Sequence, residues 1–185
     1  MRVLFLTHRV PYPPDRGDRL RALHIVRLLS AAVDLEVVSL AHDAEEATRA
    51  NALVSLFGVR ATAFRTSPVL NHLRGAFQLP SRTPLTHCLL DAPGLASFLR
   101  VVATERPPDI VLAYCSGMAR FAMEPPLLGI PFVLDFVDVD SAKWAALAQT
   151  NAWPRSWIYR REAACLGRFE AAAARAAATC TVVNE

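Results

Sequence analysis

Short apolar runs alternate with stretches of helical periodicity along almost the whole chain. The apolar runs are too short for helices and predict strands at residues 3–6, 35–41, 59–64, 110–114, 130–136 and 179–183. Apolar positions three or four residues apart predict helices at about residues 17–31, 43–57, 93–105, 141–148 and 153–178. This alternation is typical of an α/β domain. We expect a Rossmann-like, doubly wound and mostly parallel sheet with helices on both faces.

Local signals mark the ends of several of these elements. Asp43 and Glu46 match a capping box, and Gly58 provides a stop for the same helix. Leu20, Leu23 and either Val26 or Arg27 are expected on one face of the first helix, and Ser141 is expected to cap a later one. The run at residues 110–114 is apolar without alternation, which indicates a strand covered on both faces.

Residues 65–92 are the least regular part of the chain. Pro68, Pro80 and Pro84 divide the segment into short pieces, so we expect an insertion that carries one short helix. A flap that faces an acceptor is an open alternative. Farther on, residues 115–117 are predicted to form a turn after the fourth strand.

The last predicted strand looks buried, and the sequence stops directly after it, at Glu185. A domain seldom ends at the edge of its sheet without a covering helix. We therefore expect residues 1–185 to form a single Rossmann-like domain of a longer protein.

Composition narrows the function classes. The 185 residues include 53% hydrophobic and 20% charged residues, which argues against disorder. The net charge of +3 is too small to indicate a nucleic-acid partner. Nearly all basic residues are arginine, whose planar guanidinium suits phosphate and carboxylate, although a GC-rich genome gives the same bias.

The four cysteines have no metal-ligand or disulfide-framework spacing, so neither zinc nor disulfides are expected. The first apolar run is too short for a signal peptide, and no run approaches the roughly 18 residues of a membrane span. A cytoplasmic protein is expected, with peripheral contact to the inner face of a membrane left open.

The Pro-rich loop after the first predicted strand is the main candidate binding site. His8 and Arg9 follow the strand directly, and Gly17 opens the helix, where backbone N–H groups favour anions. Asp18 and Arg21 lie in the first helical turns and could bind a hydroxyl and a diphosphate. The alternative is structural: Gly17 permits a turn, Asp18 caps the helix, and His8 bonds loop backbone.

A second candidate site follows the fifth predicted strand. Alternation points Asp138 and Asp140 the same way, as in a D-x-D metal motif. The predicted elements around them do not match the protein fold in which that motif binds a metal. We predict instead that Asp138 accepts a hydrogen bond from an acceptor hydroxyl and orients it, and that no metal binds. Alternatively, Asp140 or Ser141 caps the next helix and Asp135 forms a structural ion pair.

Two further groups of residues are candidates for acceptor contact. Ser116 and Gly117 follow the fourth predicted strand and belong to the same edge of the sheet. An aromatic group near the long helix could form an acceptor or membrane surface, or pack against another domain; its members are Trp144, Trp153, Trp157 and Tyr159. A Ser-His-Asp hydrolase is not supported, because G-x-S-x-G is missing.

Two blocks of the sequence carry a resemblance to a known family. The opening LFLTHRVPYPPDRGDRLRALH and the later DFVDVDSAKW and WIYRREAACLGRFE resemble family 4 (group 1) glycosyltransferases. The narrower similarity is to sugar transferases associated with bacterial exopolysaccharide and PEP-CTERM (exosortase) systems. The resemblance implies the amino-terminal half of a GT-B fold, which mainly holds the acceptor, and a retaining reaction without metal or other cofactor. The nucleotide-sugar domain is absent from this chain, so we expect the chain alone to be inactive.

Three functions compete at this point. The favoured one is the acceptor-binding domain of a transferase that uses a nucleotide-sugar donor and a glycan or polyprenyl-linked acceptor. The alternative is a non-catalytic module that binds a glycan or a protein partner. A dinucleotide-binding enzyme is a poor third, because the first turn lacks G-x-G-x-x-G.

Overall fold

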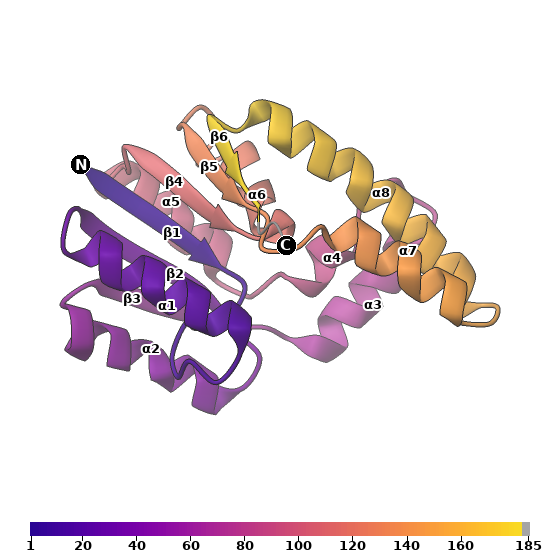
Figure 1. Ribbon diagram of the computed structural model, residues 1–185, viewed down its shortest axis with the longest axis horizontal. Helices are drawn as coiled ribbons and strands as arrows, with labels where there is room; N and C mark the ends of the chain where they lie inside the picture. Colours follow the sequence, from indigo (N-terminus) through magenta and orange to yellow (C-terminus); the bar gives the residue numbers. More distant parts are fainter. Residues whose placement is uncertain (183–185) are drawn as a thin grey trace.

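A computed structural model describes residues 1–182 and contains one six-stranded sheet (Figure 1). All strand pairs are parallel, in the order β3-β2-β1-β4-β5-β6. The strands are β1 (Arg2–Thr7), β2 (Asp34–Ala41), β3 (Arg60–Arg65), β4 (Ile110–Tyr114), β5 (Phe132–Asp135) and β6 (Thr179–Thr181). The predicted Rossmann-like sheet is therefore confirmed. The strand order reverses between β1 and β4, which is where such sheets bind ligands.

Eight helices are present within residues 1–182: α1 (Gly17–Ser30), α2 (Ala44–Phe57), α3 (Pro68–Gln78), α4 (Leu85–Leu89), α5 (Leu95–Glu105), α6 (Ser116–Met123), α7 (Asp140–Thr150) and α8 (Arg155–Ala176). The sheet lies between two apolar clusters, one on each of its faces. Val3 and Phe5 of β1 pack with α1 and α2, whereas Leu4 and Leu6 pack with α5, α6 and α8. Alternate side chains of one strand thus enter opposite cores, as expected for a strand that is covered on both faces.

The predicted ends of α2 are confirmed. The Asp43 carboxylate accepts a hydrogen bond from the Glu46 backbone N–H at 2.7 Å, and Gly58 adopts a left-handed conformation with φ of 65°. The predicted face of α1 is confirmed at Val26, which is fully buried, but Leu20 is 43% exposed and Arg19 is buried instead. The Arg19 guanidinium lies 2.7 Å from the buried Glu46 carboxylate of α2, and this ion pair holds Arg19 on the inner side of α1.

Other predictions need correction. Residues 65–92 form two helices, α3 and α4, instead of one. The predicted turn at residues 115–117 is instead the start of α6. Helix α7 begins at Asp140 with Val139 at the N-cap, because the Ser141 hydroxyl donates to Glu170 of α8.

The last strand also differs from its prediction. All three residues of β6 are exposed, whereas a buried strand was expected. Within the described part of the chain β6 pairs only with β5, which makes it an edge strand. The predicted continuation to Val183 lies outside the described residues. None of the helices within residues 1–182 combines the length and the apolar character needed to cross a membrane.

Candidate functional site

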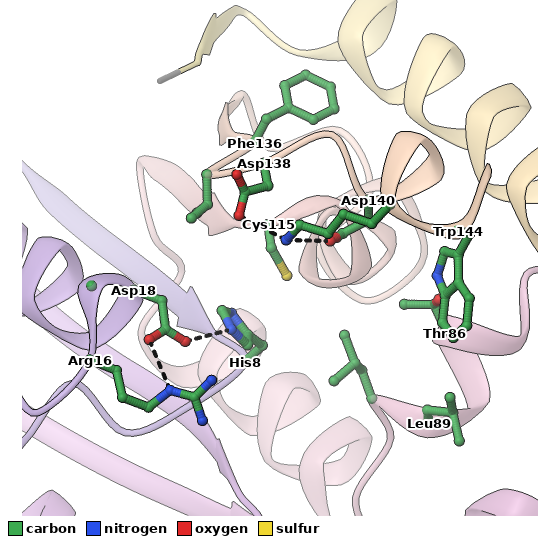
Figure 2. A pocket seen from close by; sticks show the side chains of 14 residues that line it. His8, Arg16, Asp18, Thr86, Leu89, Cys115, Phe136, Asp138, Asp140 and Trp144 are labelled. Carbon is green, nitrogen blue, oxygen red and sulfur yellow. Dashed lines mark hydrogen bonds and ion pairs between the residues drawn. The ribbon is translucent and has the colours of Figure 1, made fainter. Parts of the chain in front are cut away.

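A cavity of about 490 Å³ opens at the carboxyl ends of β1, β4 and β5 (Figure 2). It lies beside the point where the strand order reverses. Its walls come from the loop before α1, from α4, and from the segment that joins β5 to α7. The lining residues are His8, Arg16, Gly17, Asp18, Thr86, Leu89, Leu90, Cys115, Phe136, Val137, Asp138, Asp140, Lys143 and Trp144.

His8 is held in a fixed orientation on one wall. Its Nε2 lies 3.4 Å from the Asp18 carboxylate, and its ring stacks on Tyr114 with 5.9 Å between centroids. The Tyr114 hydroxyl in turn donates a 2.8 Å hydrogen bond to the backbone carbonyl of Asp18. The last residue of β4 therefore anchors both the histidine and the start of α1.

This wall carries an excess of positive charge. Arg9 Nε lies 3.8 Å and Arg16 Nε 3.7 Å from Asp18, so three basic side chains surround one carboxylate. The His8 hydrogen bond, with help from the Arg19 backbone N–H and nearby cations, holds the Asp18 pKa well below its usual range. Burial alone would lower the pKa of His8, but the Cys115 sulfur and the Asp18 carboxylate raise it to about 10. These contacts therefore favour the imidazolium form of His8, which donates a hydrogen bond to Asp18.

The amino terminus of α1 adds to the same positive wall. Its N-cap residue is Arg16, whose side chain makes no capping hydrogen bond, and Gly17 lines the cavity. Asp18 lies inside the first turn and accepts from the Arg19 backbone N–H at 3.0 Å. A 14-residue helix that begins at a cavity places partial positive charge there, which favours an anionic ligand.

The opposite wall carries carboxylates. Lys143 Nζ lies 2.7 Å from Asp138 and 3.5 Å from Asp140, which is also held by the Ser116 hydroxyl at 3.0 Å. Although burial lowers the pKa of Lys143, its hydrogen bond to Asp138 and the two negative charges raise it. The Asp138 side chain is 59% exposed against 24% for Asp140, so Asp138 is the carboxylate that a ligand can reach.

Backbone strain marks the same cavity. Cys115 has φ of 80° and Val137 has φ of 59°, and both residues line the cavity at the ends of adjacent strands. Non-glycine residues in this region cost free energy, and they cluster at functional sites. The Asp135 carboxylate stabilises the second of these turns by accepting from the Val137 backbone N–H at 2.9 Å.

The structure brings together five of the residues predicted for the site. His8, Gly17, Asp18, Asp138 and Asp140 all line the cavity. Figure 2 shows Asp18 and His8 toward one side, with Asp138 and Asp140 across from them.

The other predicted residues lie behind or beside the cavity. Arg9 contacts Asp18, and Ser116 is fully buried and reaches the cavity only through Asp140. Arg21 pairs with the buried Asp135 at 2.7 Å, as the structural alternative for Asp135 predicted, and lines a separate depression beside α1. Gly117 is buried where α6 approaches α4, and a Cβ there would meet Leu90 at 2.4 Å.

Several residues of the cavity were not singled out from the sequence as site residues. Cys115, Val137 and Lys143 had no local signal, since backbone strain and contacts across the fold are not visible in a single sequence. By contrast, Trp144 belongs to the aromatic group that the sequence suggested for an acceptor or membrane surface; it lines the cavity and packs on Tyr159 with 5.3 Å between centroids. Within residues 1–182, no group of three His, Cys, Asp or Glu side chains is arranged to hold a metal ion.

No family model matches the chain, and no curated protein matches it. Among solved structures, the chain is similar to UGT2 of Phytolacca americana, whose structure contains UDP-2fluoro-glucose and pterostilbene. The identity is 12% and the TM-score 0.53; the match covers 100% of this chain and 48% of that one, so the chain spans about half of that protein's length. The chain thus has the Rossmann-like fold of one half of a GT-B glycosyltransferase, as predicted.

Proposed function

We propose that this chain is the acceptor-side domain of a glycosyltransferase in exopolysaccharide biosynthesis. The observation that carries the proposal is the cavity at the strand-order reversal, in which a cationic wall lies opposite the exposed carboxylate of Asp138. A nucleotide-sugar presents a diphosphate and an acceptor presents a hydroxyl, so the two walls match the two partners. The similar structure of UGT2 contains UDP-2fluoro-glucose and pterostilbene, and this supports a nucleotide-sugar and a second organic ligand as partners here.

Each wall has its own role in the proposed reaction. Arg16 and the N–H groups at the start of α1 donate hydrogen bonds to the diphosphate as it leaves, and the positive charge of His8 adds to their attraction. The bond between the anomeric carbon and the phosphate oxygen breaks, the acceptor oxygen bonds to that carbon, and its proton passes to the released diphosphate. Asp138 accepts a hydrogen bond from the acceptor hydroxyl and orients it. Orientation without a strong base is compatible with the retaining reaction of the resembled family.

The roles of the two walls suggest which molecules the chain binds. We propose a glycan or a polyprenyl-linked sugar as the acceptor, with Leu89, Leu90 and Trp144 against its apolar part. We expect the nucleotide to be held mainly by a second Rossmann-like domain, which this chain does not contain. The chain alone would then bind an acceptor without turning over.

The test uses the product of the complete gene with a panel of nucleotide-sugars and of polyprenyl-phosphate or oligosaccharide acceptors. Release of nucleoside diphosphate that increases with acceptor concentration supports the proposal. If no donor is consumed while the 185-residue chain still binds oligosaccharide, the chain is a non-catalytic glycan-binding module.

A further inference from the structure

Helix α3 has an unusual division of apolar and polar residues. Val69, Leu73 and Phe77 are 75%, 54% and 86% exposed, and their spacing of four places them on one side of the helix. The buried positions are Asn71 and Gly75. A helix of a water-soluble protein normally buries its apolar side, so the outward side of α3 requires a partner of its own.

Polar contacts hold α3 in this orientation. The Asn71 amide donates to the backbone carbonyls of Leu89 at 3.2 Å and Asp91 at 2.8 Å. At the other end, the Arg161 guanidinium of α8 donates to the carbonyls of Gln78 at 3.0 Å and Ser81 at 2.7 Å. These hydrogen bonds therefore hold α3 in an orientation that leaves Val69, Leu73 and Phe77 exposed.

The amino terminus of α8 continues this surface. Trp157 is 48% exposed and lies four residues before Arg161, hence on the side of α8 that faces the carboxyl end of α3. Trp153, in the turn before α8, is 81% exposed. Figure 1 shows α3 and the α7–α8 turn at the same end of the molecule.

The charged side chains from α3 to α4 and at the start of α8 are all positive. Residues 66–90 and 151–161 contain five arginines and no carboxylate, while the other 15 basic and all 17 acidic residues lie elsewhere. Arg74 contacts Asp91 at 3.3 Å. Arg82, Arg155 and Arg160 are exposed and have no ion-pair partner among the described residues.

We propose that α3 and the amino-terminal turn of α8 form a docking surface for an anionic lipid bilayer. Phenylalanine and tryptophan side chains enter the interfacial region, and arginines beside them pair with lipid phosphates. Because α4 follows α3 and lines the cavity, docking places the cavity next to the lipid surface. That consequence, delivery of a lipid-linked acceptor, rests on the proposed function, whereas bilayer binding itself does not.

The test is co-sedimentation of the 185-residue protein with vesicles of phosphatidylcholine alone or mixed with phosphatidylglycerol. Binding is expected only with phosphatidylglycerol, weakened by salt, with a blue shift of tryptophan fluorescence. Phe77→Ser and Trp153→Ser are each expected to lower the partition coefficient about fivefold. Leu128→Ser is the control, since Leu128 is 63% exposed outside this surface.

Three results would overturn the proposal: no binding to phosphatidylglycerol vesicles by folded protein, equal loss with Leu128→Ser, or self-association that Phe77→Ser abolishes. The last result would assign the surface to a second copy of the chain. Nucleotide release with a water-soluble oligosaccharide acceptor is measured in parallel without vesicles. A failure of transfer therefore remains distinguishable from a failure of docking.

Discussion

Among single residues, the ion pair of His8 and Asp18 determines the charge of one wall of the cavity. Each raises the stability of the charged form of the other, so the site keeps an imidazolium and a carboxylate side by side. This arrangement favours binding of an anion over removal of a proton by His8.

The His8 pKa can be measured directly by NMR titration of the ring. We expect titration far above the usual range for histidine, near the value of about 10 that its contacts indicate. Cys115→Ser should lower this pKa, because the Cys115 sulfur is the largest of the contacts that raise it. Cys180→Ser should leave it unchanged, since Cys180 is exposed on β6. A His8 that titrates near its ordinary value of 6.5 would contradict the description of this wall.

The same pair makes the stability of the fold depend on pH. A histidine with a raised folded-state pKa stabilises the fold fully below its unfolded value of 6.5, and this contribution disappears as pH rises toward about 10. Denaturant unfolding at about pH 6 and about pH 9.5 should show a loss of stability in the wild type that is smaller in His8→Gln. Equal losses in both proteins would remove His8 as the cause.

The sequence indicated where some of the cavity residues would lie. His8, Asp138 and Asp140 follow buried strands, whose ends meet at one edge of the sheet, and Asp18 lies in the first turn of the next helix. That they bind a ligand stays a prediction. Lys143 is the sole lysine of the sequence, but its contact with Asp138 depends on how α7 turns after β5, which a single sequence does not show.

At the scale of elements, α4 shows why short helices escape sequence patterns. It has five residues, and its amino terminus is held by a side chain from far along the chain. The buried Glu162 carboxylate of α8 accepts from the backbone N–H groups of Leu85 at 2.7 Å and Thr86 at 2.9 Å. No local pattern indicates a cap that is supplied by another helix.

This cap gives a stability prediction. Glu162→Ala should lower the free energy of unfolding by about 3 kcal/mol, because it leaves the backbone N–H groups of Leu85 and Thr86 without an acceptor and removes the carboxylate beside the Arg161 guanidinium. The matched control, Glu105→Ala at an exposed position, should stay within about 0.5 kcal/mol. Urea unfolding of the three proteins measures both, and an equal small effect would show that α4 does not depend on Glu162.

At the scale of the whole molecule, the order of strands and helices was sufficient to predict the sheet. Six parallel strands follow from six short apolar runs separated by helices, because parallel neighbours require a crossover. The edges were less predictable: β6 is exposed, although its sequence resembles that of a buried strand. Its exposure depends on what lies beside it and not on its own residues.

Whether this cavity orients an acceptor hydroxyl through Asp138 can be tested with Asp138→Asn in the product of the complete gene. We expect kcat/KM for acceptor-dependent release of nucleoside diphosphate to fall at least about tenfold, or about 1.4 kcal/mol. Glu45→Gln, an exposed carboxylate on α2 outside the cavity, should leave it unchanged. Unchanged kinetics for Asp138→Asn in a folded protein would contradict the account.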